Sequence, residues 1–231
     1  MSNNKLTIFF LIIFSPLSLF GQNVDSIIRD IRSEYNIIVN NKDSYKKVVL
    51  IIDVYFGEYE DSELDREKII TYYIDEKNKQ IKLISLFDMW AHHFSVNGTL
   101  TEYYLKDGNL FFIYQQNKYV LGHGQPPDVI ENRLTEVTER RIYTVGNINS
   151  LDKKNCVRYL VKSLEGKLSD INELSQHTAN VETDCNMSTS YISFSVEELL
   201  DIFYGRDESV KLSDEPLSFL SLYYYNMLFG Q

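Results

Sequence analysis

"LTEYYLKDGNLFFIYQQ", residues 100–116, carries the clearest local structural signal in this chain. Two runs of aromatic and aliphatic residues flank the pair Asp107-Gly108, a strong local signal for the two-residue turn of a β-hairpin. Because strand residues alternate between the two faces of a sheet, each face of this hairpin would receive large apolar side chains. The surrounding structure must therefore explain why a sheet has two apolar faces.

A turn at Asp107-Gly108 also predicts the register of the hairpin. Leu105 is expected opposite Leu110, and Tyr103 opposite Phe112. One face would then carry Thr101, Tyr103, Leu105, Leu110, Phe112 and Tyr114. The other face would carry Leu100, Glu102, Tyr104, Phe111 and Ile113.

Three interpretations of the two apolar faces stay open. Helices could cover one face while loops or the C-terminal part cover the other. One face could instead be an exposed aromatic platform for a ligand, or an interface with a partner or a second copy. The chain has 17 tyrosines, whose rings and hydroxyls suit half-wet surfaces. We therefore take Tyr103, Phe112 and Tyr114 as candidate binding residues.

A charged cluster begins the segment "ERRIYTV", residues 139–145. The segment is typical of a further strand. Arg140 or Arg141 could pair with Glu102 across the sheet, or hold an anionic ligand through two parallel hydrogen bonds. Neighbouring strand residues point to opposite faces, so only one of the two arginines can join the aromatic set. We include Arg140 among the candidate binding residues, beside the purely structural alternative.

The N-terminus predicts the compartment. Residues 1–21 have the layout of a secretory signal peptide, with Lys5 ahead of an apolar run at residues 6–14. That run is too short to cross a bilayer. We expect cleavage between Gly21 and Gln22. With no cysteine near that point, the predicted product is periplasmic or secreted, and not lipid-anchored.

The composition limits the classes of partner that are expected. The formal net charge is −10, and no basic stripe offsets it, so nucleic acid is not an expected partner. The two cysteines, Cys156 and Cys185, are predicted to form a disulfide in an oxidising compartment.

The order of local signals predicts an α+β fold with an N-terminal helix, an antiparallel β-meander sheet and a helical C-terminal portion. Apolar residues at helical spacing mark residues 24–41 as a helix. Short β-like runs joined by turn residues occupy residues 46–145, with "VNGT" at 96–99 read as a turn. Three further helices are predicted at 152–166, 195–205 and 213–230, and a polar loop at 174–190. The expected division is a domain at 22–165 and a helical extension at 166–231.

Four quoted segments, in order, carry a resemblance: "IRDIRSEYNII", "ITYYID" followed by "KQIKLIS", "TEYYLKDGNLFFIY" and "ERRIYTVGN". They resemble a group of uncharacterised exported proteins of Gram-negative bacteria, which have an EYYF-x-DG-x-L-x-F-x-Y hairpin and an E-x-R-x-Y strand. The likeness covers roughly residues 27–162. It implies an α+β domain with a meandering sheet, and it implies no activity and no catalytic residues.

The sequence contains no recognisable catalytic, metal-binding or cofactor-binding motif. His92-His93, with Asp88 nearby, could hold a metal only on a helix, and His123 lies in a turn-like "GHGQPPD" loop. There is no nucleophile elbow, zinc-protease motif, P-loop or dinucleotide fingerprint, so neither a metal nor a cofactor is predicted. We expect an exported, non-catalytic binding or accessory protein for a peptide, glycan or protein. The alternatives are a structural envelope protein or a hydrolase built from scattered residues.

Overall fold

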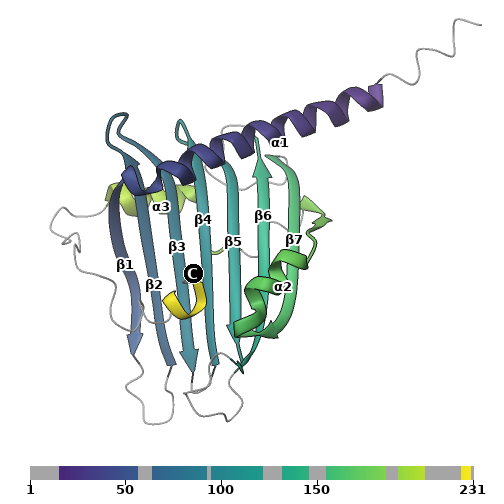
Figure 1. The fold of residues 1–231 in the computed structure, drawn as a ribbon. Coiled ribbons are helices and arrows are strands. Elements are labelled where there is room, and N and C mark those ends of the chain that lie inside the picture. Colours follow the sequence, from purple (N-terminus) through teal and green to yellow (C-terminus); the bar gives the residue numbers. More distant parts are fainter. Residues whose placement is uncertain are drawn as a thin grey trace, which may run out of the picture.

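The computed structural model describes residues 16–56, 64–92, 95–121, 132–145, 155–185, 192–205 and 225–229. In this part of the chain eight strands form one antiparallel sheet, in which each strand pairs with the next along the sequence (Figure 1). The strands are β1 (Lys46–Phe56), β2 (Leu64–Asp75), β3 (Gln80–His92), β4 (Ser95–Lys106), β5 (Asn109–Val120), β6 (Leu134–Thr144), β7 (Cys156–Lys167) and β8 (Val181–Thr183). The predicted antiparallel meander is confirmed.

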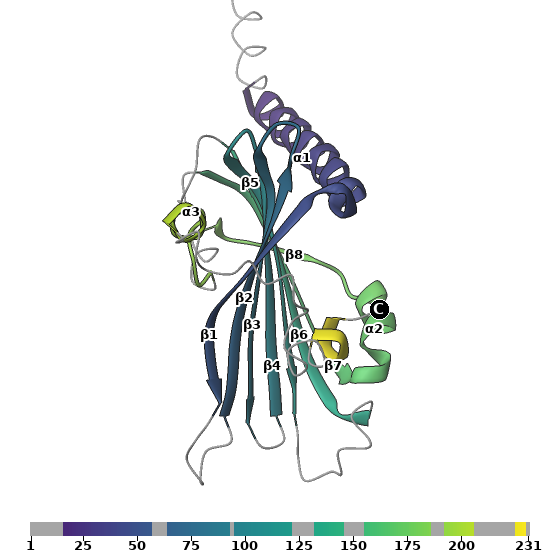
Figure 2. The same ribbon diagram turned by 90° about the vertical axis from the view of Figure 1, so that its left-hand side faces the viewer.

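Helices precede and follow the strands, which confirms the α+β class. They are α1 (Pro16–Asn41), α2 (Ile171–His177) and α3 (Val196–Gly205), with the 3-10 turns η1 (Lys42–Ser44) and η4 (Leu168–Asp170). A short helical segment also occupies residues 225–229. Figure 2 shows α3 on one side of the sheet and α1, α2 and the 225–229 segment on the other. We call these sides the α3 face and the α1 face.

The hairpin of β4 and β5 turns where the sequence predicts. Asp107 and Gly108 both have positive φ angles, of 51° and 78°, as a tight hairpin turn of the favoured kind requires. Leu105 pairs with Leu110 as expected.

Beyond that pair the predicted register is wrong. Tyr104 pairs with Phe112 and Tyr103 with Ile113, because the register shifts after Leu105 and leaves Phe111 as an extra residue on β5. Such a β-bulge moves every following side chain of one strand to the opposite face. Tyr103 and Phe112, predicted on the same face, therefore lie on opposite faces.

On the α3 face, buried residues of β2, β4, β5 and β6 pack against α3. They include Tyr72, Tyr103, Ile113 and Ile142, which pack with Leu199 of α3. The hydroxyl of Tyr72 donates to the Leu199 carbonyl at 2.7 Å, and that of Tyr103 donates to the Phe194 carbonyl at 2.9 Å. Two phenols thus satisfy their own buried hydroxyls while fixing the approach of α3.

The start of α3 has the predicted capping box. The Ser195 hydroxyl accepts the backbone N–H of Glu198 at 3.2 Å, and the Glu198 carboxylate accepts the backbone N–H of Ser195 at 2.7 Å. The hydrogen bonds that the Ser195 backbone N–H and hydroxyl donate to the carboxylate hold the pKa of Glu198 below its usual value. Two of the donors that a helix start leaves open are satisfied in this way.

On the α1 face, two separate clusters are buried. Ile28, Ile31 and Ile38 of α1 pack on a sheet cluster made by Leu83, Tyr104, Phe112 and Tyr143. Further along the strands, Leu228 of the 225–229 segment packs with Ile69, Phe87, Met89 and Val96. Helices therefore cover both apolar faces, which is the first of the three interpretations.

Three local predictions are wrong. Residues 156–167 are the strand β7 and not a helix, because they pair along their length with β6. The polar stretch at 174–190 contains part of α2 and the short strand β8. Residues 96–99 belong to β4, and at Gly98 an added Cβ would force the Leu228 side chain to move. Pairing and packing override local propensity in each case.

Some predictions fall outside the described residues. They concern residues 1–15 of the predicted signal peptide, His93, the loop around His123 and the predicted helix start at residue 214. The backbone of α1 begins at Pro16, ahead of the expected cleavage point, and β7 runs across the expected domain boundary at residue 165.

The predicted disulfide is confirmed: Cys156 and Cys185 are joined, with their Cα atoms 5.9 Å apart. The bridge closes a loop with a sequence separation of 29 and ties β7 to the segment that follows β8. Removing the bridge increases the conformational entropy of the unfolded chain, which lowers the stability of the fold.

We expect the double variant Cys156→Ser/Cys185→Ser to lose roughly 3–4 kcal/mol of unfolding free energy, the value for a loop of about 30 residues. Urea unfolding of the variant and of the wild type measures this loss. Reductant should reproduce the loss in the wild type and leave the variant unchanged. Equal unfolding midpoints in all four samples would contradict the prediction.

Candidate functional site

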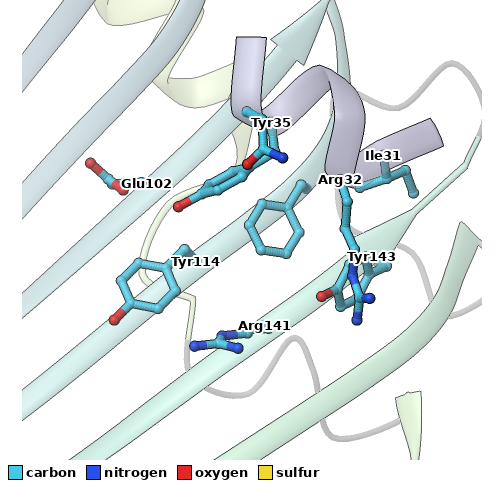
Figure 3. A pocket seen from close by; sticks show the side chains of 9 residues that line it. Ile31, Arg32, Tyr35, Glu102, Tyr114, Arg141 and Tyr143 are labelled. Atoms are coloured by element: carbon cyan, nitrogen blue, oxygen red, sulfur yellow. The ribbon is translucent and has the colours of Figure 1, made fainter. Parts of the chain in front are cut away.

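A pocket of about 470 Å³ lies between α1 and the sheet. It forms where α1 crosses the strands. Helical spacing directs Ile31 and Tyr35 toward the sheet and places Arg32 and Asn36 on the flank of the helix. From α1 the pocket is lined by Ile31, Arg32, Tyr35 and Asn36, and from β4, β5 and β6 by Glu102, Phe112, Tyr114, Arg141 and Tyr143 (Figure 3). A second pocket, of about 440 Å³, lies between the end of α1 and the β2–β3 turn.

Aromatic rings form the floor of the first pocket and hold α1 to the sheet. The ring of Tyr35 lies 5.3 Å from that of Phe112 at 80°, an edge-to-face contact, and the ring of Phe112 lies 5.0 Å from that of Tyr143. Such contacts contribute about 0.5–1.5 kcal/mol beyond the burial of area. The floor is therefore rigid and apolar.

Glu102 is the only acid among the described residues that line the pocket. One carboxylate oxygen accepts a hydrogen bond from the Lys42 ammonium at 2.8 Å, and the other accepts one from the Tyr104 hydroxyl at 2.6 Å. Burial raises the pKa of Tyr104, and the neighbouring charge of Glu102 raises it further. Both oxygens are thus occupied by groups that stay protonated at neutral pH.

Lys42 belongs to η1, immediately after α1, so its contact with Glu102 links the end of the helix to β4. Burial alone opposes the charge of Lys42, but the carboxylate of Glu102, helped by Tyr73, raises the pKa of Lys42 above its usual value. The ammonium also lies 5.0 Å from the centre of the Tyr73 ring, within cation–π range.

Beside the pocket, on the same face of the sheet, a buried ion pair joins β6 to β7. Glu139 and Lys162 are both buried, and their charged atoms lie 3.0 Å apart. The Lys162 ammonium also donates to the Ser175 hydroxyl of α2 at 2.6 Å. Arg141 is a weaker partner of Glu139, at 3.4 Å. The charge of Glu139 is therefore balanced mainly by Lys162, and part of the hydrogen-bonding capacity of Arg141 remains unused.

The phenols of the pocket act as donors. Burial raises the pKa of Tyr114, as does the nearby Glu139 carboxylate. Burial and then Glu102 raise the pKa of Tyr35 in the same way. Both hydroxyls remain protonated across the physiological range. That of Tyr35 is already engaged with the Tyr104 hydroxyl, whereas that of Tyr114 can donate a hydrogen bond into the pocket.

The structure brings only part of the predicted site together. Phe112 and Tyr114 line the pocket. Tyr103 is buried on the opposite face under α3. Arg140 is also on that face, where it donates to the Gln115 side chain at 3.0 Å.

The remaining lining residues escaped sequence reasoning. Arg32 and Asn36 follow Ile31 and Tyr35 of the apolar α1 stripe by one position each, so they flank it. The spacing of Ile31 and Tyr35 is the available signal for them. Arg141 was weighed beside Arg140, and the register of β5 with β6, in which Tyr114 lies opposite Arg141, decides which of the two shares a face with Phe112.

Two searches of the described residues return nothing. No group of three or more histidine, cysteine or acidic side chains there is placed to hold a metal ion. No helix within the same residues has the length and apolar character needed to cross a membrane. Comparison with protein-family models, with curated proteins and with solved structures finds no match to this chain.

We expect Lys162→Met to lower the unfolding free energy by about 3–5 kcal/mol, because it leaves the buried Glu139 without its main counter-charge. Chemical unfolding monitored by circular dichroism measures the change. Lys167→Met, at the exposed end of the same strand, is the matched control and should change stability by less than about 0.5 kcal/mol. In the double variant Glu139→Gln/Lys162→Met part of the loss should return. If Lys162→Met is as stable as Lys167→Met, the Glu139–Lys162 pair does not stabilise the fold.

Proposed function

We propose that this protein is an exported, non-catalytic binding protein whose ligand occupies the pocket between α1 and the sheet. The observation that carries the proposal is the composition of the lining. Aromatic rings form an apolar floor, while Arg32, Arg141 and Tyr114 add polar groups around it. Ligand pockets typically combine an apolar surface with a few placed polar groups, at volumes of roughly 300–1,000 Å³.

The same lining favours binding over catalysis. A general base needs a side chain that can accept a proton from the substrate. The one acid on the described lining, Glu102, already accepts hydrogen bonds at both oxygens. No histidine, cysteine or serine is among those lining residues.

The structural alternative also has support. Helices cover both apolar faces of the hairpin, so no aromatic platform is left that needs a partner. A protein without a ligand would then use α1 simply as a lid over the sheet. The two functions differ in one respect, which is whether the pocket is occupied.

We expect Asn36→Trp to block the pocket, because residue 36 lies exposed on the rim and a large side chain there fills space without disturbing the core. A thermal-shift screen of the mature protein against peptides and envelope glycans measures ligand binding. At about 100 times the dissociation constant a ligand adds about 2.7 kcal/mol of stability, or about 5–10 °C for a domain of this size.

The matched control is Asn40→Trp, an equally exposed position on the same helix that does not line the pocket. The shift should persist in this control and vanish in Asn36→Trp. A shift that survives in both variants would place the ligand elsewhere. A screen without any shift would favour the structural alternative.

Export is part of the proposal. It is supported by the layout of residues 1–21 and by the disulfide, which is typical of oxidising compartments. Expressed from its full sequence in a Gram-negative host, the protein should appear outside the cytoplasm with Gln22 as its first residue. Intact-mass measurement checks this. Leu11→Arg, which interrupts the apolar run, should leave the unprocessed chain in the cytoplasm. Finding the wild type there, uncleaved and with reduced cysteines, would refute export.

A further inference from the structure

Two arginines stand at the pocket with unused hydrogen-bond donors. Arg32 is exposed on α1, and among the described residues no acid pairs with it. Arg141 is reached by Glu139 at 3.4 Å, whereas Glu139 makes its closer contact, at 3.0 Å, with Lys162. In Figure 3 the Arg32 side chain descends from α1 toward the sheet, and the Arg141 side chain lies beneath the aromatic rings.

The charge at the pocket is opposite to that of the chain. The protein has a formal net charge of −10, yet the one acid on the described lining, Glu102, is paired with Lys42. Glu139, the acid that contacts Arg141 from beside the pocket, is paired more closely with Lys162. A local excess of positive charge in an acidic protein attracts anions to that place and repels them elsewhere. The ligand should therefore carry negative charge.

The hydrogen-bonding groups of the pocket indicate which class of anion it can bind. The guanidinium groups and the protonated phenol of Tyr114 are donors, while each oxygen of the Glu102 carboxylate already accepts one hydrogen bond. Sugar hydroxyls also need acceptors for their own hydrogens, and the described lining has fewer acceptors than the donors of its two guanidinium groups. A carboxylate and a neighbouring amide carbonyl need donors only, and arginine binds a carboxylate through two parallel hydrogen bonds.

The apolar floor of the pocket indicates the chemical character of the rest of the ligand. Phe112 and Ile31 offer surface to an apolar side chain, and the edge of the Tyr35 ring lies beside them. A pocket of about 470 Å³ holds one or two residues of a peptide but not a folded partner. Capture of a terminal carboxylate beside an apolar pocket is a recurring mode of peptide recognition.

We propose that the pocket binds the free C-terminal end of a peptide, with its carboxylate between Arg32 and Arg141 and an apolar last side chain on Phe112. The inference rests on the proposed function, because it names the ligand class of the same pocket. It goes further in assigning the two arginines as the residues that determine specificity.

The probe is the tetrapeptide glycyl-glycyl-alanyl-phenylalanine with an N-terminal fluorophore, compared with the same peptide ending in a carboxamide. Fluorescence anisotropy measures both affinities. We expect the acid to bind at least tenfold more tightly than the amide, and the difference to shrink as salt is raised. Arg32→Gln and Arg141→Gln should each weaken binding of the acid tenfold to a hundredfold, with little effect on the amide.

Arg29→Gln is the matched control, since Arg29 is exposed on the same helix and does not line the pocket. It should leave both affinities unchanged. Because Arg141 touches Glu139, the melting temperature of each variant is measured as well. Arg141→Lys should keep part of the affinity, and Arg32→Gln, at an exposed helical position, tests the inference even if Arg141→Gln unfolds.

Failure of this inference and failure of the proposed function have different signatures. Equal binding of acid and amide, blocked by Asn36→Trp but not by the arginine variants, would overturn the inference and keep the pocket as the binding site. Binding of a glucuronic acid tetrasaccharide that depends on Arg32, without binding of the peptide, would replace the peptide by an acidic glycan and overturn the assignment. Binding of the peptide acid that Asn36→Trp leaves intact would overturn both.

Discussion

The two apolar faces of the β4–β5 hairpin are the constraint on which the rest of the structure depends. A sheet that is apolar on both sides can be stable in water only when other elements cover each side. Here α3 covers one face and α1 the other, and each is placed by aromatic residues of the strands beneath it. The tyrosines explain why the cover is specific. Tyr72 and Tyr103 bury their rings and use their hydroxyls to fix α3, so apolar packing and orientation come from the same side chains.

The α1 face is covered less evenly, and its polar residues occupy the gap. Between the α1 cluster and the cluster around Leu228, the strands carry charged side chains that are buried or nearly so, among them Glu102, Glu139 and Lys162. Burying such charges is tolerable only when each is paired and hydrogen-bonded. Glu102 is paired with Lys42, and Glu139 with Lys162. The pocket lies where this polar region meets the aromatic floor under α1, so it has an apolar and a charged side.

Sequence reasoning succeeded where local signals and tertiary structure agree. The Asp107-Gly108 turn, the capping box of α3, the stripe of α1 and the disulfide are all set by residues close in sequence or by compartment. It failed where distant residues decide. β7 reads as a helix until β6 is available to pair with it. Gly98 reads as a turn until Leu228 requires the space.

The candidate site was harder to predict than the fold for the same reason. A pocket depends on which side chains share a face, and the β-bulge at Phe111 reverses that for half of the hairpin. No residue at the bulge announces it, since phenylalanine is ordinary in a strand. Tyr103 was therefore grouped with Phe112 and Tyr114. Arg140 was included because the register of β6 against β5 cannot be read from the sequence, and that register places Arg141 beside Tyr114.

How firmly α1 is held decides what kind of binding the pocket supports. The ion pairs of α1 with the sheet, such as Glu34 with Lys106 at 2.8 Å and Asp25 with Arg158 at 3.6 Å, include exposed partners and contribute roughly 0–1 kcal/mol each. Burial of Ile28, Ile31 and Ile38, each less than 10% exposed, contributes about 1.5–3 kcal/mol per side chain and therefore dominates. A ligand cannot lift α1 without exposing these residues. A ligand of the proposed kind would then enter past the exposed flank that carries Arg32 and Asn36, into a pocket already formed. Little ordering is needed on binding, so the affinity for a short ligand is not lost to reorganisation.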